Sequence, residues 1–463
     1  MSKGAKLPRG FDRKSYLRLA LPMIISRAGL AAMGIADGIM VSRFSPHEFA
    51  WLSLAEGTVG RLLDVFLSFL IGGLALVPRH FSRGDKAGAR WIWLRTFPVA
   101  VGLGLLALIV AFFGTSLLTL LGQAHEVSAG AAPCMVILAA GYPAALMAIA
   151  AAIYLEGINR PQFVAVAVVS ANVINVALNW LFIGGHLGLP AMGARGSALS
   201  TTIVRCALGI ALAGFAWRWH REEPFEDTET HRAERTASRR AQWRLGAGAG
   251  VTVAAMATLT APLTLIAGRL GIIPLATFSA AWNIAGPAAL VALGMADAAG
   301  IYVASEAAQG DLRAAAKAAW SALYVTLVPI AVAAVALSLW AFPCAWLYTR
   351  DATMRVSLAA VLPFVGLTVL VDSVGFVMIS ALRSLRETAW PTGIQIGAMA
   401  LLVPLAFSLA WQRGYGVPGL FIAMLASGCV RALLLVWRFW GRTNGKAPEL
   451  AVPVEQEWSL NVE

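Results

Sequence analysis

Residues 219–245, WHREEPFEDTETHRAERTASRRAQWRL, form the longest polar stretch of the sequence and divide it into two apolar halves. Both signs of charge alternate in this stretch and aliphatic side chains are few, as in a solvated linker. Of the 463 residues, 59% are hydrophobic and 13% are charged, and the mean hydropathy is +0.73. Soluble proteins carry about 25% charged residues. The composition therefore predicts a polytopic α-helical membrane protein and excludes a soluble enzyme, a nucleic-acid-binding module and a secreted disulfide scaffold.

Apolar stretches long enough to span a membrane as helices occur on both sides of the linker. They cover 17–41, 51–77, 97–121, 131–155, 162–184 and 196–218, and then 246–269, 276–304, 318–342, 357–381, 391–411 and 417–438. We predict an all-α protein with 12 transmembrane helices. Its expected parts are a tail 1–16, an N-lobe 17–218, a cytoplasmic linker 219–245, a C-lobe 246–438 and a tail 439–463.

The two halves resemble each other at a constant offset of 226 in the numbering. The matching positions are Arg43 and Arg269, Ala50 and Ala276, Gly84-Asp85 and Gly310-Asp311, Gly193 and Gly419, and Val204-Arg205 and Val430-Arg431. Such a constant offset indicates an internal repeat. Because six spans bring the chain back to the same side, the repeats are parallel, and repeats of this kind commonly hold a substrate at their interface near the midplane.

The formal net charge of +12 reflects membrane topology and not a nucleic-acid partner. Lys and Arg concentrate in both tails, in the linker and in the loops after spans 2, 4, 8 and 10. The opposite loops carry only Arg43, Arg195, Arg269, Arg350, Arg355 and Arg413. The richer side is cytoplasmic, so we expect a multi-pass protein of the cell inner membrane, surrounded by lipids, with both termini inside. The four cysteines form no CxxC or Cys/His cluster, so we expect neither a disulfide nor a metal site.

Asp37 is a charged residue predicted at membrane depth, where charge is costly and marks function by default. It ends the stretch AAMGIAD, a turn or two from the outer end of span 1, and glycines at positions 34 and 38 leave room around it. A poorly solvated carboxylate there can gain and lose a proton or bind Na⁺. The alternative is an aspartate that reaches out to periplasmic water, and we favour the functional interpretation.

Span 5 contains a row of amides in SANVINVALNW, residues 170–180. Asn172, Asn175 and Asn179 share one face of a helix at this spacing. Amide oxygens are hard ligands and hydrogen-bond partners for a carboxylic acid. Bonding between helices is the alternative role, but an intramembrane Asp in the same half favours a polar cavity.

Further charges fall within spans 1 and 2. Arg61 and Asp64 are three residues apart and can pair on one helix face, and Glu56 lies in the same span. Arg27 lies in span 1. Because arginine cannot lose its proton, it must be paired or hydrated. A neutralised pair and direct contact with a substrate both remain open for Arg27, Glu56, Arg61 and Asp64.

Two carboxylates lie in the second half, Asp297 in span 8 and Asp372 in span 10. Each either pairs with an arginine of another span or titrates, as proton relays of transporters do. Arg205 and Arg431 occupy equivalent positions of the repeat, which suggests an architectural role. Conventional enzyme chemistry is disfavoured because no P-loop occurs and every histidine falls in a loop or at a span end: His47, His80, His125, His186, His220 and His231.

Several of these segments together resemble the multidrug and toxic compound extrusion (MATE) transporters of bacteria. LALPMIISRAGLAAMGIADGIMVSRF looks like the first helix of that family and FSRGDKAGA like its Gly-Asp loop. INVALNWLFIGG, GARGSALSTT and VDSVGFVMISALRSLRETAWPT resemble its fifth helix, its sixth helix, and its tenth helix with the following loop. The resemblance spans residues 15–440. It implies a V-shaped pair of six-helix lobes that exports organic solutes by antiport against H⁺ or Na⁺, without another cofactor, as a monomer.

The resemblance also implies roles for individual residues. Asp37 would be the coupling carboxylate of the N-lobe, with Asn175, Asn179 and Thr201 as its partners. Asp372 matches a carboxylate that contributes to the C-lobe cation site in one branch of the family. That branch carries a glutamate in helix 7, whereas the seventh span here, GAGVTVAAMATLTAPLTLIAG, has no acid. The pattern is therefore closer to the branch that couples through the N-lobe, often by protons, and Asp297 matches no family residue.

Three functional hypotheses remain. The leading hypothesis is a secondary exporter of small organic compounds that works by alternating access. A flippase for a lipid-linked oligosaccharide or similar precursor is the alternative, and a membrane-embedded enzyme is disfavoured. Because Arg27 and Arg61 lie at membrane depth and guanidinium groups bind carboxylates in a bidentate manner, we expect an anionic or zwitterionic cargo.

Overall fold

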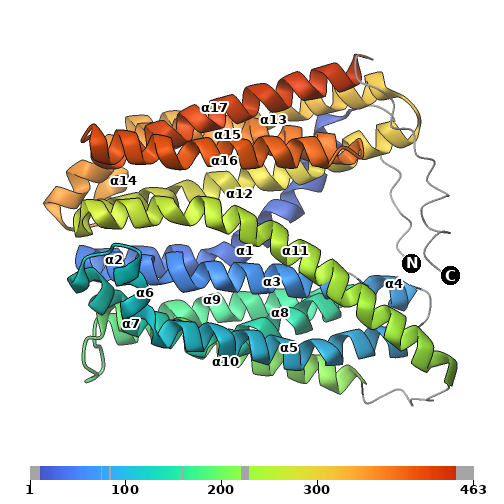
Figure 1. The fold of residues 1–463 in the computed structure, drawn as a ribbon, viewed down its shortest axis with the longest axis horizontal. Helices are drawn as coiled ribbons and strands as arrows, with labels where there is room; N and C mark the ends of the chain where they lie inside the picture. The colour runs from blue at the N-terminus through green and yellow to red at the C-terminus, as the bar shows by residue number, and fades with distance from the viewer. Residues whose placement is uncertain (1–10, 75, 83–84, 159, 221–228, 445–463) are drawn as a thin grey trace.

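The computed structural model describes residues 11–74, 76–82, 85–158, 160–220 and 229–444. Within these residues the chain forms two lobes of roughly parallel helices, which meet at one end and diverge toward the end where the first helix begins and the last helix ends (Figure 1). We call these the closed end and the open end. Regular secondary structure in the described residues is helical throughout, as predicted.

The N-terminal half supplies the helices of one lobe. They are α1 (Arg13–Phe44), α2 (Pro46–Ala55), the π-helix η1 (Glu56–Gly60), α3 (Arg61–Leu74), α4 (Val77–Ser82), α5 (Lys86–Phe112), α6 (Gly114–Leu120), α7 (His125–Ala140), α8 (Tyr142–Gly157), α9 (Pro161–Ile183) and α10 (Gly193–His220).

The C-terminal half supplies the other lobe. Its helices are α11 (Glu229–Leu270), α12 (Ile272–Ala308), α13 (Leu312–Leu339), α14 (Ala341–Tyr348), α15 (Ala352–Ser384), α16 (Ala389–Phe407), the π-helix η2 (Ser408–Gln412) and α17 (Gly416–Thr443). Of the predicted linker 219–245, residues 219–220 end α10 and residues 229–245 belong to α11, while residues 221–228 lie outside the described part of the chain.

These elements agree with the twelve predicted spans. Within the described residues, 9 helical segments are long and apolar enough to cross a membrane, and α7 with α8, bent by 42° at their junction, makes a tenth. The crossing helices α1 and α11 complete the set. Short helices such as α6 and α14 lie at the closed end between spans (Figure 1).

The internal repeat is visible in the positions of the helices. The start of α12 follows the start of α2 at the repeat offset, and the start of α13 follows that of α5 in the same way. The carboxylates of Asp85 and Asp311 cap α5 and α13, because they accept from the backbone N–H of Gly88 at 2.7 Å and of Ala314 at 2.8 Å. A carboxylate at this position satisfies a backbone donor that lacks a helical partner, which explains why the Asp recurs in both halves.

The first helix of each half crosses to the opposite lobe at the open end (Figure 1). Near the start of α1, the Tyr16 hydroxyl donates to the Met295 carbonyl of α12 at 2.8 Å. The equivalent position on α11 is Gln242, whose Nε2 donates to Thr96 Oγ1 of α5 at 3.1 Å. Trp243 adds an edge-on ring contact with Phe69 of α3. Each half therefore contributes its first helix to both lobes.

Close helix packing depends on glycines at a few positions. A Cβ on Gly104 of α5 would lie 2.6 Å from the backbone Cα of Pro143 on α8, closer than two carbon atoms can pack. On the same helix, a Cβ on Gly102 would meet nothing within 4 Å. Small residues let helix backbones approach where lipid offers no hydrophobic driving force for association.

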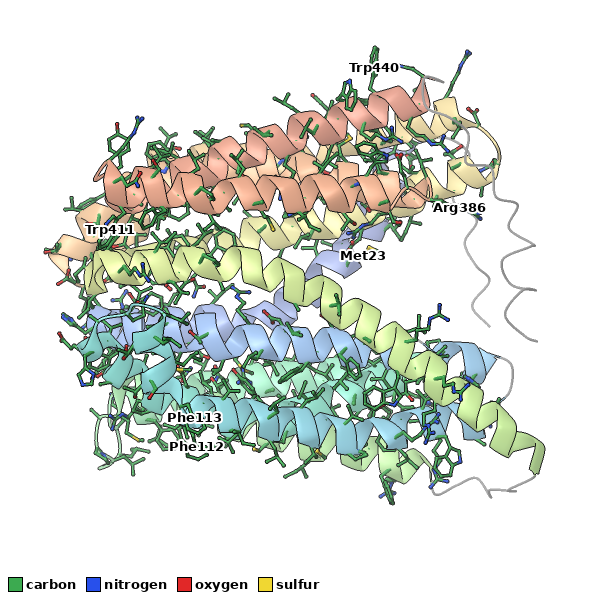
Figure 2. All side chains as sticks on the ribbon, in the orientation of Figure 1. Met23, Phe112, Phe113, Arg386, Trp411 and Trp440 are labelled. Atoms are coloured by element: carbon green, nitrogen blue, oxygen red, sulfur yellow. The ribbon has the colours of Figure 1, made fainter. Side chains whose placement is uncertain are left out.

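The outward surface is that of a membrane protein. Phe112 and Phe113 at the end of α5 are about two-thirds exposed, and Trp411 and Trp440 lie at opposite ends of the C-lobe (Figure 2). Tryptophans at the two ends of the helices correspond to the aromatic belts found at membrane interfaces. The many exposed apolar side chains would face lipid.

Candidate functional site

The carboxylate of Asp37 lies inside the N-lobe, between α1, α9 and α10. Its side chain is 2% exposed. Asn179 on α9 donates through Nδ2 to Asp37 Oδ1 at 2.5 Å, and the Thr201 hydroxyl on α10 donates to Asp37 Oδ2 at 2.8 Å. Both oxygens of the carboxylate are thus held by neutral donors from two different helices.

A second layer of amide contacts orders this cluster. Asn175 Oδ1 accepts from Asn179 Nδ2 at 3.1 Å, and Asn175 Nδ2 donates to Thr201 Oγ1 at 3.4 Å. Asn175, Asn179 and Thr201 are all buried. Asn172 instead donates to the Val168 carbonyl of its own helix. The four residues that the sequence grouped as an N-lobe coupling site therefore contact one another.

Basic residues lie near Asp37 but do not bond to it among the described residues. The charge of Arg205 on α10 acts on both Asp37 and Glu56, and Arg205 lies over the ring of Tyr142 at 5.3 Å. Arg205 Nη1 is buried without a hydrogen-bond partner in the described structure. Glu56, at the start of the π-helix η1, lies within electrostatic range of Asp37 and Arg61. Short π-helical turns within helices occur frequently at functional sites.

Asp372 in the C-lobe has a different environment. Arg431 on α17 donates through Nη2 to Asp372 Oδ1 at 2.5 Å and through Nη1 to Gln395 Oε1 at 3.3 Å. The Arg431 side chain is 9% exposed and that of Asp372 is 21% exposed. Of the alternatives left open for Asp372, the structure shows the ion pair with an arginine of another span.

The two acids have no counterparts in the repeat. The position equivalent to Asp37 is Leu263 and the position equivalent to Asp372 is Leu146, whereas Arg205 and Arg431 are equivalent to each other. The backbone is thus repeated while the carboxylates are not. A repeated arginine appears beside an acid in each lobe, which gives these arginines a place at both sites beyond the architectural role predicted for them.

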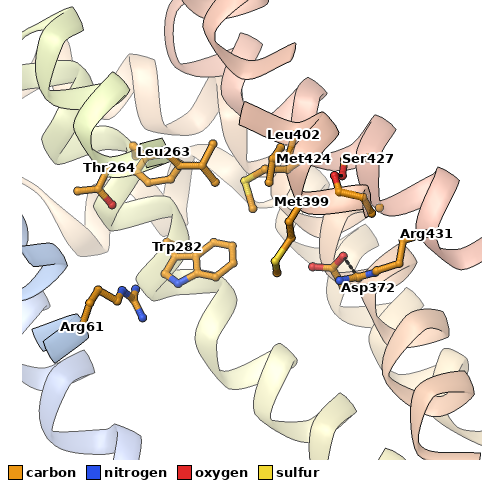
Figure 3. A pocket seen from close by; sticks show the side chains of 13 residues that line it. Arg61, Leu263, Thr264, Trp282, Asp372, Met399, Leu402, Met424, Ser427 and Arg431 are labelled. Carbon is orange, nitrogen blue, oxygen red and sulfur yellow. Dashed lines mark hydrogen bonds and ion pairs between the residues drawn. The ribbon is translucent and has the colours of Figure 1, made fainter. Parts of the chain in front are cut away.

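A cavity of about 120 Å³ lies between the lobes next to Asp372 (Figure 3). Arg61 on α3 reaches it from the N-lobe, while Asp372 and Arg431 border it on the opposite side (Figure 3). Trp282 on α12 lies between these charged groups. The rest of its lining comes from the C-lobe: Leu263, Thr264, Phe278, Ala398, Met399, Leu402, Met424, Ser427 and Gly428.

The remaining predicted residues lie at various places. Arg61 pairs with Asp64 through Nη1 and Oδ2 at 3.1 Å, and the two side chains are 42% and 47% exposed. Asp297 lies partly buried on α12 and is not among the residues that line the cavity. Arg27 belongs to α1, and its side chain lies outside the described part of the structure.

Three residues of these sites could not be identified as site residues from the sequence alone. Trp282 and Met399 resemble ordinary apolar span residues, and only the three-dimensional arrangement places them in the cavity. Arg431 is recognisable as a repeat position, but its contact with Asp372 joins two different helices that are far apart in the sequence. The available signal is that an intramembrane arginine must have a partner.

Fold and sites together define a multi-pass membrane transporter built from two six-span repeats around a charged interlobe cavity. The family model described as MatE matches residues 22–181 and 249–408, one block in each half. The chain belongs to this family. The two blocks begin at nearly the repeat offset, so the comparison and the structure divide the chain in the same way.

Curated relatives match over nearly their whole length. The Probable multidrug resistance protein NorM of Caulobacter vibrioides is 29% identical over 442 residues, which cover 93% of each chain. The protein of the same name from Rhizobium meliloti is 28% identical over 449 residues, which cover 92% of this chain and 93% of the relative.

Solved structures share the fold. One is an inward-facing multidrug resistance MATE family transporter of the MOP superfamily, with a TM-score of 0.81 and 18% identity, covering 93% of this chain and 98% of that one. Another is a MOP superfamily transporter from Pyrococcus furiosus described as having a binding pocket of reversed polarity. It has a TM-score of 0.70 and 20% identity, and covers 97% of this chain and 100% of the other.

Proposed function

We propose that this protein is a secondary active exporter that moves small organic compounds out of the cell in exchange for protons, with Asp37 as the coupling residue. Family membership and relatives named for multidrug resistance support export of organic compounds. They favour this function over a flippase for lipid-linked precursors and over an enzyme. The choice of coupling ion rests on the environment of Asp37.

The observation that carries the proposal is a contrast between two acids. Asp372 has a guanidinium bonded to it, whereas Asp37 is held only by an amide and a hydroxyl among the described residues. A buried carboxylate without a bonded cation is stable chiefly when it takes up a proton or an external cation. Asp37, unlike Asp372, is therefore an acid whose charge can change during a transport cycle.

The partners of Asp37 can serve both of its protonation states. Asn179 Nδ2 donates to a carboxylate, while Asn179 Oδ1 is buried without a partner in the described structure. Rotation of the amide would present that oxygen to a carboxylic acid, because an amide offers a donor on one side and an acceptor on the other. The Thr201 hydroxyl can likewise donate or accept. Such a pair of partners accommodates a proton without rearrangement of the helices.

Sodium is the competing ion. It requires several oxygen ligands at once, and in this arrangement Asn179 presents a nitrogen to the carboxylate while the seventh span supplies no acid. The geometry supports H⁺ over Na⁺.

The transport cycle follows from the two lobes. We take the open end as the cytoplasmic end, because α1 begins and α17 ends there (Figure 1) and the basic loops favour that side. Protonation of Asp37 from the outside and its deprotonation to the inside would bias the lobes between inward-open and outward-open states, because the two states differ in how well they hold the proton.

The test is transport in everted vesicles or proteoliposomes with pH and Na⁺ gradients imposed separately. We expect export to follow the pH gradient and Asp37→Asn to abolish gradient-driven export, because an amide cannot carry the proton. Asp37→Asn should still insert and purify as the wild-type protein does. Undiminished export by this variant, or export that follows Na⁺ at fixed pH and ignores the pH gradient, would refute the proposal.

A further inference from the structure

The interlobe cavity presents opposite charges from opposite lobes. Arg61 lines it, but its partner Asp64 does not, so the ion pair of the N-lobe turns its positive end to the cavity. Asp372 faces it from the C-lobe. Its Oδ1 is held by Arg431, and its Oδ2 has no hydrogen-bond partner among the described residues.

Two features make these charges available to a ligand. Arg61 is 42% exposed and only its Nη1 is bonded to a described residue, so the other guanidinium nitrogens are free to donate. Arg431 is nearly buried and is engaged by Asp372 and Gln395, so it orients the carboxylate and leaves one oxygen to the cavity. Each lobe thus supplies one group of defined sign.

The space between the charges suits an apolar or aromatic body. Trp282 lies between Arg61 and Asp372 (Figure 3), and its flat ring can stack on a ring of the cargo. Met399 and Met424 line the same cavity. Methionine side chains are flexible and adapt to ligands of different shape.

We propose that the preferred cargo is a zwitterion with an apolar or aromatic body, bound with its carboxylate toward Arg61 and its ammonium group toward Asp372 Oδ2. This inference rests on the proposed export function and names its substrate class. A simple cation would meet the unpaired edge of Arg61, and a simple anion would meet Asp372. Because the two charges belong to different lobes, separation of the lobes would break one contact and weaken binding at release.

A matched set of fluorescent probes tests the proposal. 4′-(Aminomethyl)biphenyl-4-carboxylic acid carries an ammonium and a carboxylate at opposite ends of an aromatic body, 4-(aminomethyl)biphenyl is the same molecule without the carboxylate, and the N-acetylated amino acid lacks the ammonium. Binding to the purified full-length protein is measured at neutral pH without any gradient. We expect the zwitterion to bind about tenfold more tightly than either control, the size of effect expected when one charge-assisted contact is gained.

Two variants assign the ends of the site. Arg61→Gln should bring the affinity for the zwitterion down to that for 4-(aminomethyl)biphenyl and leave the latter unchanged, while Arg61→Lys retains part of the preference. Asp372→Asn should weaken the two ammonium-bearing probes and spare the acetylated one. Equal affinity of all three probes for the wild type, tightest binding of 4-(aminomethyl)biphenyl, or an equal loss for all probes in Arg61→Gln would overturn the proposal.

The coupling proposal and the cargo inference are tested by different measurements, so either can fail without the other. Asp37→Asn should keep the order of probe affinities, because the measurement involves no gradient. If Asp37→Asn exported normally, the assignment of Asp37 as the coupling residue would be wrong. The order of probe affinities would still test the cargo inference. If the probe order failed while Asp37→Asn abolished export, only the cargo inference would be lost.

A second inference comes from the closed end, where two arginines of the repeat cross the lobe interface reciprocally. Arg43 of the N-lobe donates through Nη1 to the Leu347 carbonyl of the C-lobe at 2.7 Å. Arg269 of the C-lobe donates through Nη2 to the Leu121 carbonyl of the N-lobe at 2.9 Å. The donors match each other at the repeat offset, and so do the acceptors, so the two contacts are related by the repeat.

The acceptors lie at the C-terminal ends of the short helices α14 and α6, where backbone carbonyls lack helical partners and the helix dipole favours a positive charge. The surrounding interface is also reciprocal. A Cβ on Gly38 would collide with Asn283 Nδ2, and the repeat-equivalent pair is Gly57 and Thr264, with a Cβ to Cγ2 distance of 3.0 Å. The contacts therefore belong to a two-fold related interface that exists only when the lobes are together at this end.

We propose that Arg43 and Arg269 are a pair of latches that hold the closed end shut until the lobes open outward. The test measures spin-label distances across the closed end, between Leu189→Cys and Tyr415→Cys, with Cys134, Cys206, Cys344 and Cys429 replaced by serine. Arg43→Ala and Arg269→Ala should each shift the population toward longer distances, and the double variant by about tenfold in the ratio of the two states.

Arg355→Ala is the matched control. Arg355 donates to the Arg350 carbonyl of its own lobe at 2.9 Å, so its loss removes a similar contact that does not cross the interface, and the distances should stay as in the parent protein. The proposal would be wrong if the distances in the double variant were the same as in the parent, or changed no more than in Arg355→Ala.

Discussion

The ion pair between Asp372 and Arg431 combines high burial with a single direct contact. Removal of one partner leaves the other charge in a poorly solvated position, which costs more than the pair itself contributes. Asp372 retains access to the cavity, so the cost here falls below that of a fully enclosed pair. Arg431→Gln should lower the free energy of unfolding by about 2 kcal/mol.

The loss of stability in Arg431→Gln should depend on pH and on the presence of Asp372. At low pH the stranded carboxylate can be neutralised by protonation, so the loss of stability should be smaller at pH 5 than at pH 8. The double variant Asp372→Asn/Arg431→Gln should recover most of the wild-type melting temperature in detergent. Additive losses in the double variant would show that the two side chains do not act as a pair.

At the level of helices, the contact between α5 and α8 depends on the absence of a side chain at Gly104. Gly104→Ala places a Cβ against the backbone of Pro143, which cannot move aside as a side chain would. We expect a loss of about 1 to 3 kcal/mol, the usual cost of overpacking, measured as a lower melting temperature. Gly102→Ala, on the same helix and facing open space, should leave the stability equal or higher.

Most helices can be predicted because their apolar stretches are long and end in polar loops. The exceptions have physical causes. Residues 229–245 are polar in both signs and predict a linker, yet they form the beginning of α11, where Gln242 and Trp243 pack on the opposite lobe. A contact with a distant helix produces no hydrophobic periodicity in the polar stretch itself, so the sequence does not predict a helix there.

The candidate site is predictable to the extent that it uses unusual residue types. Asp37, Asn175 and Asn179 stand out in apolar spans, and the structure brings them together with Thr201. The π-helical turn η1 and the cavity residue Trp282 cannot be foreseen, because neither has a distinctive composition. The sequence also leaves Asp372 between pairing and titration, a choice that only the position of Arg431 decides.

For the whole molecule, the exchange of first helices predicts that the two halves can assemble as separate chains. Co-expressed fragments 1–224 and 225–463 should co-purify and export cargo, because α1 and α11 each pack on the opposite lobe. Gly246→Leu should reduce co-purification, since a Cβ there would lie 2.7 Å from the Phe69 carbonyl. Gly393→Leu on α16, where a Cβ meets nothing within 4 Å, is the control, and equal yields for both would contradict this role of α11.

The positions of the repeat that are equivalent to Asp37 and Asp372 are leucines, which limits the number of protons that can be exchanged for each cargo molecule. With Asp37 as the coupling acid and Asp372 already paired, one proton enters per molecule exported, and a zwitterion carries no net charge outward. Each turnover then moves one positive charge inward, so voltage and pH gradient contribute equally. A total driving force of about 150 mV corresponds to about 3.5 kcal/mol, which sustains a cargo ratio of about 300. Reversal potentials of reconstituted protein would show a slope of one charge per cargo, and a slope of two would require a second titrating acid.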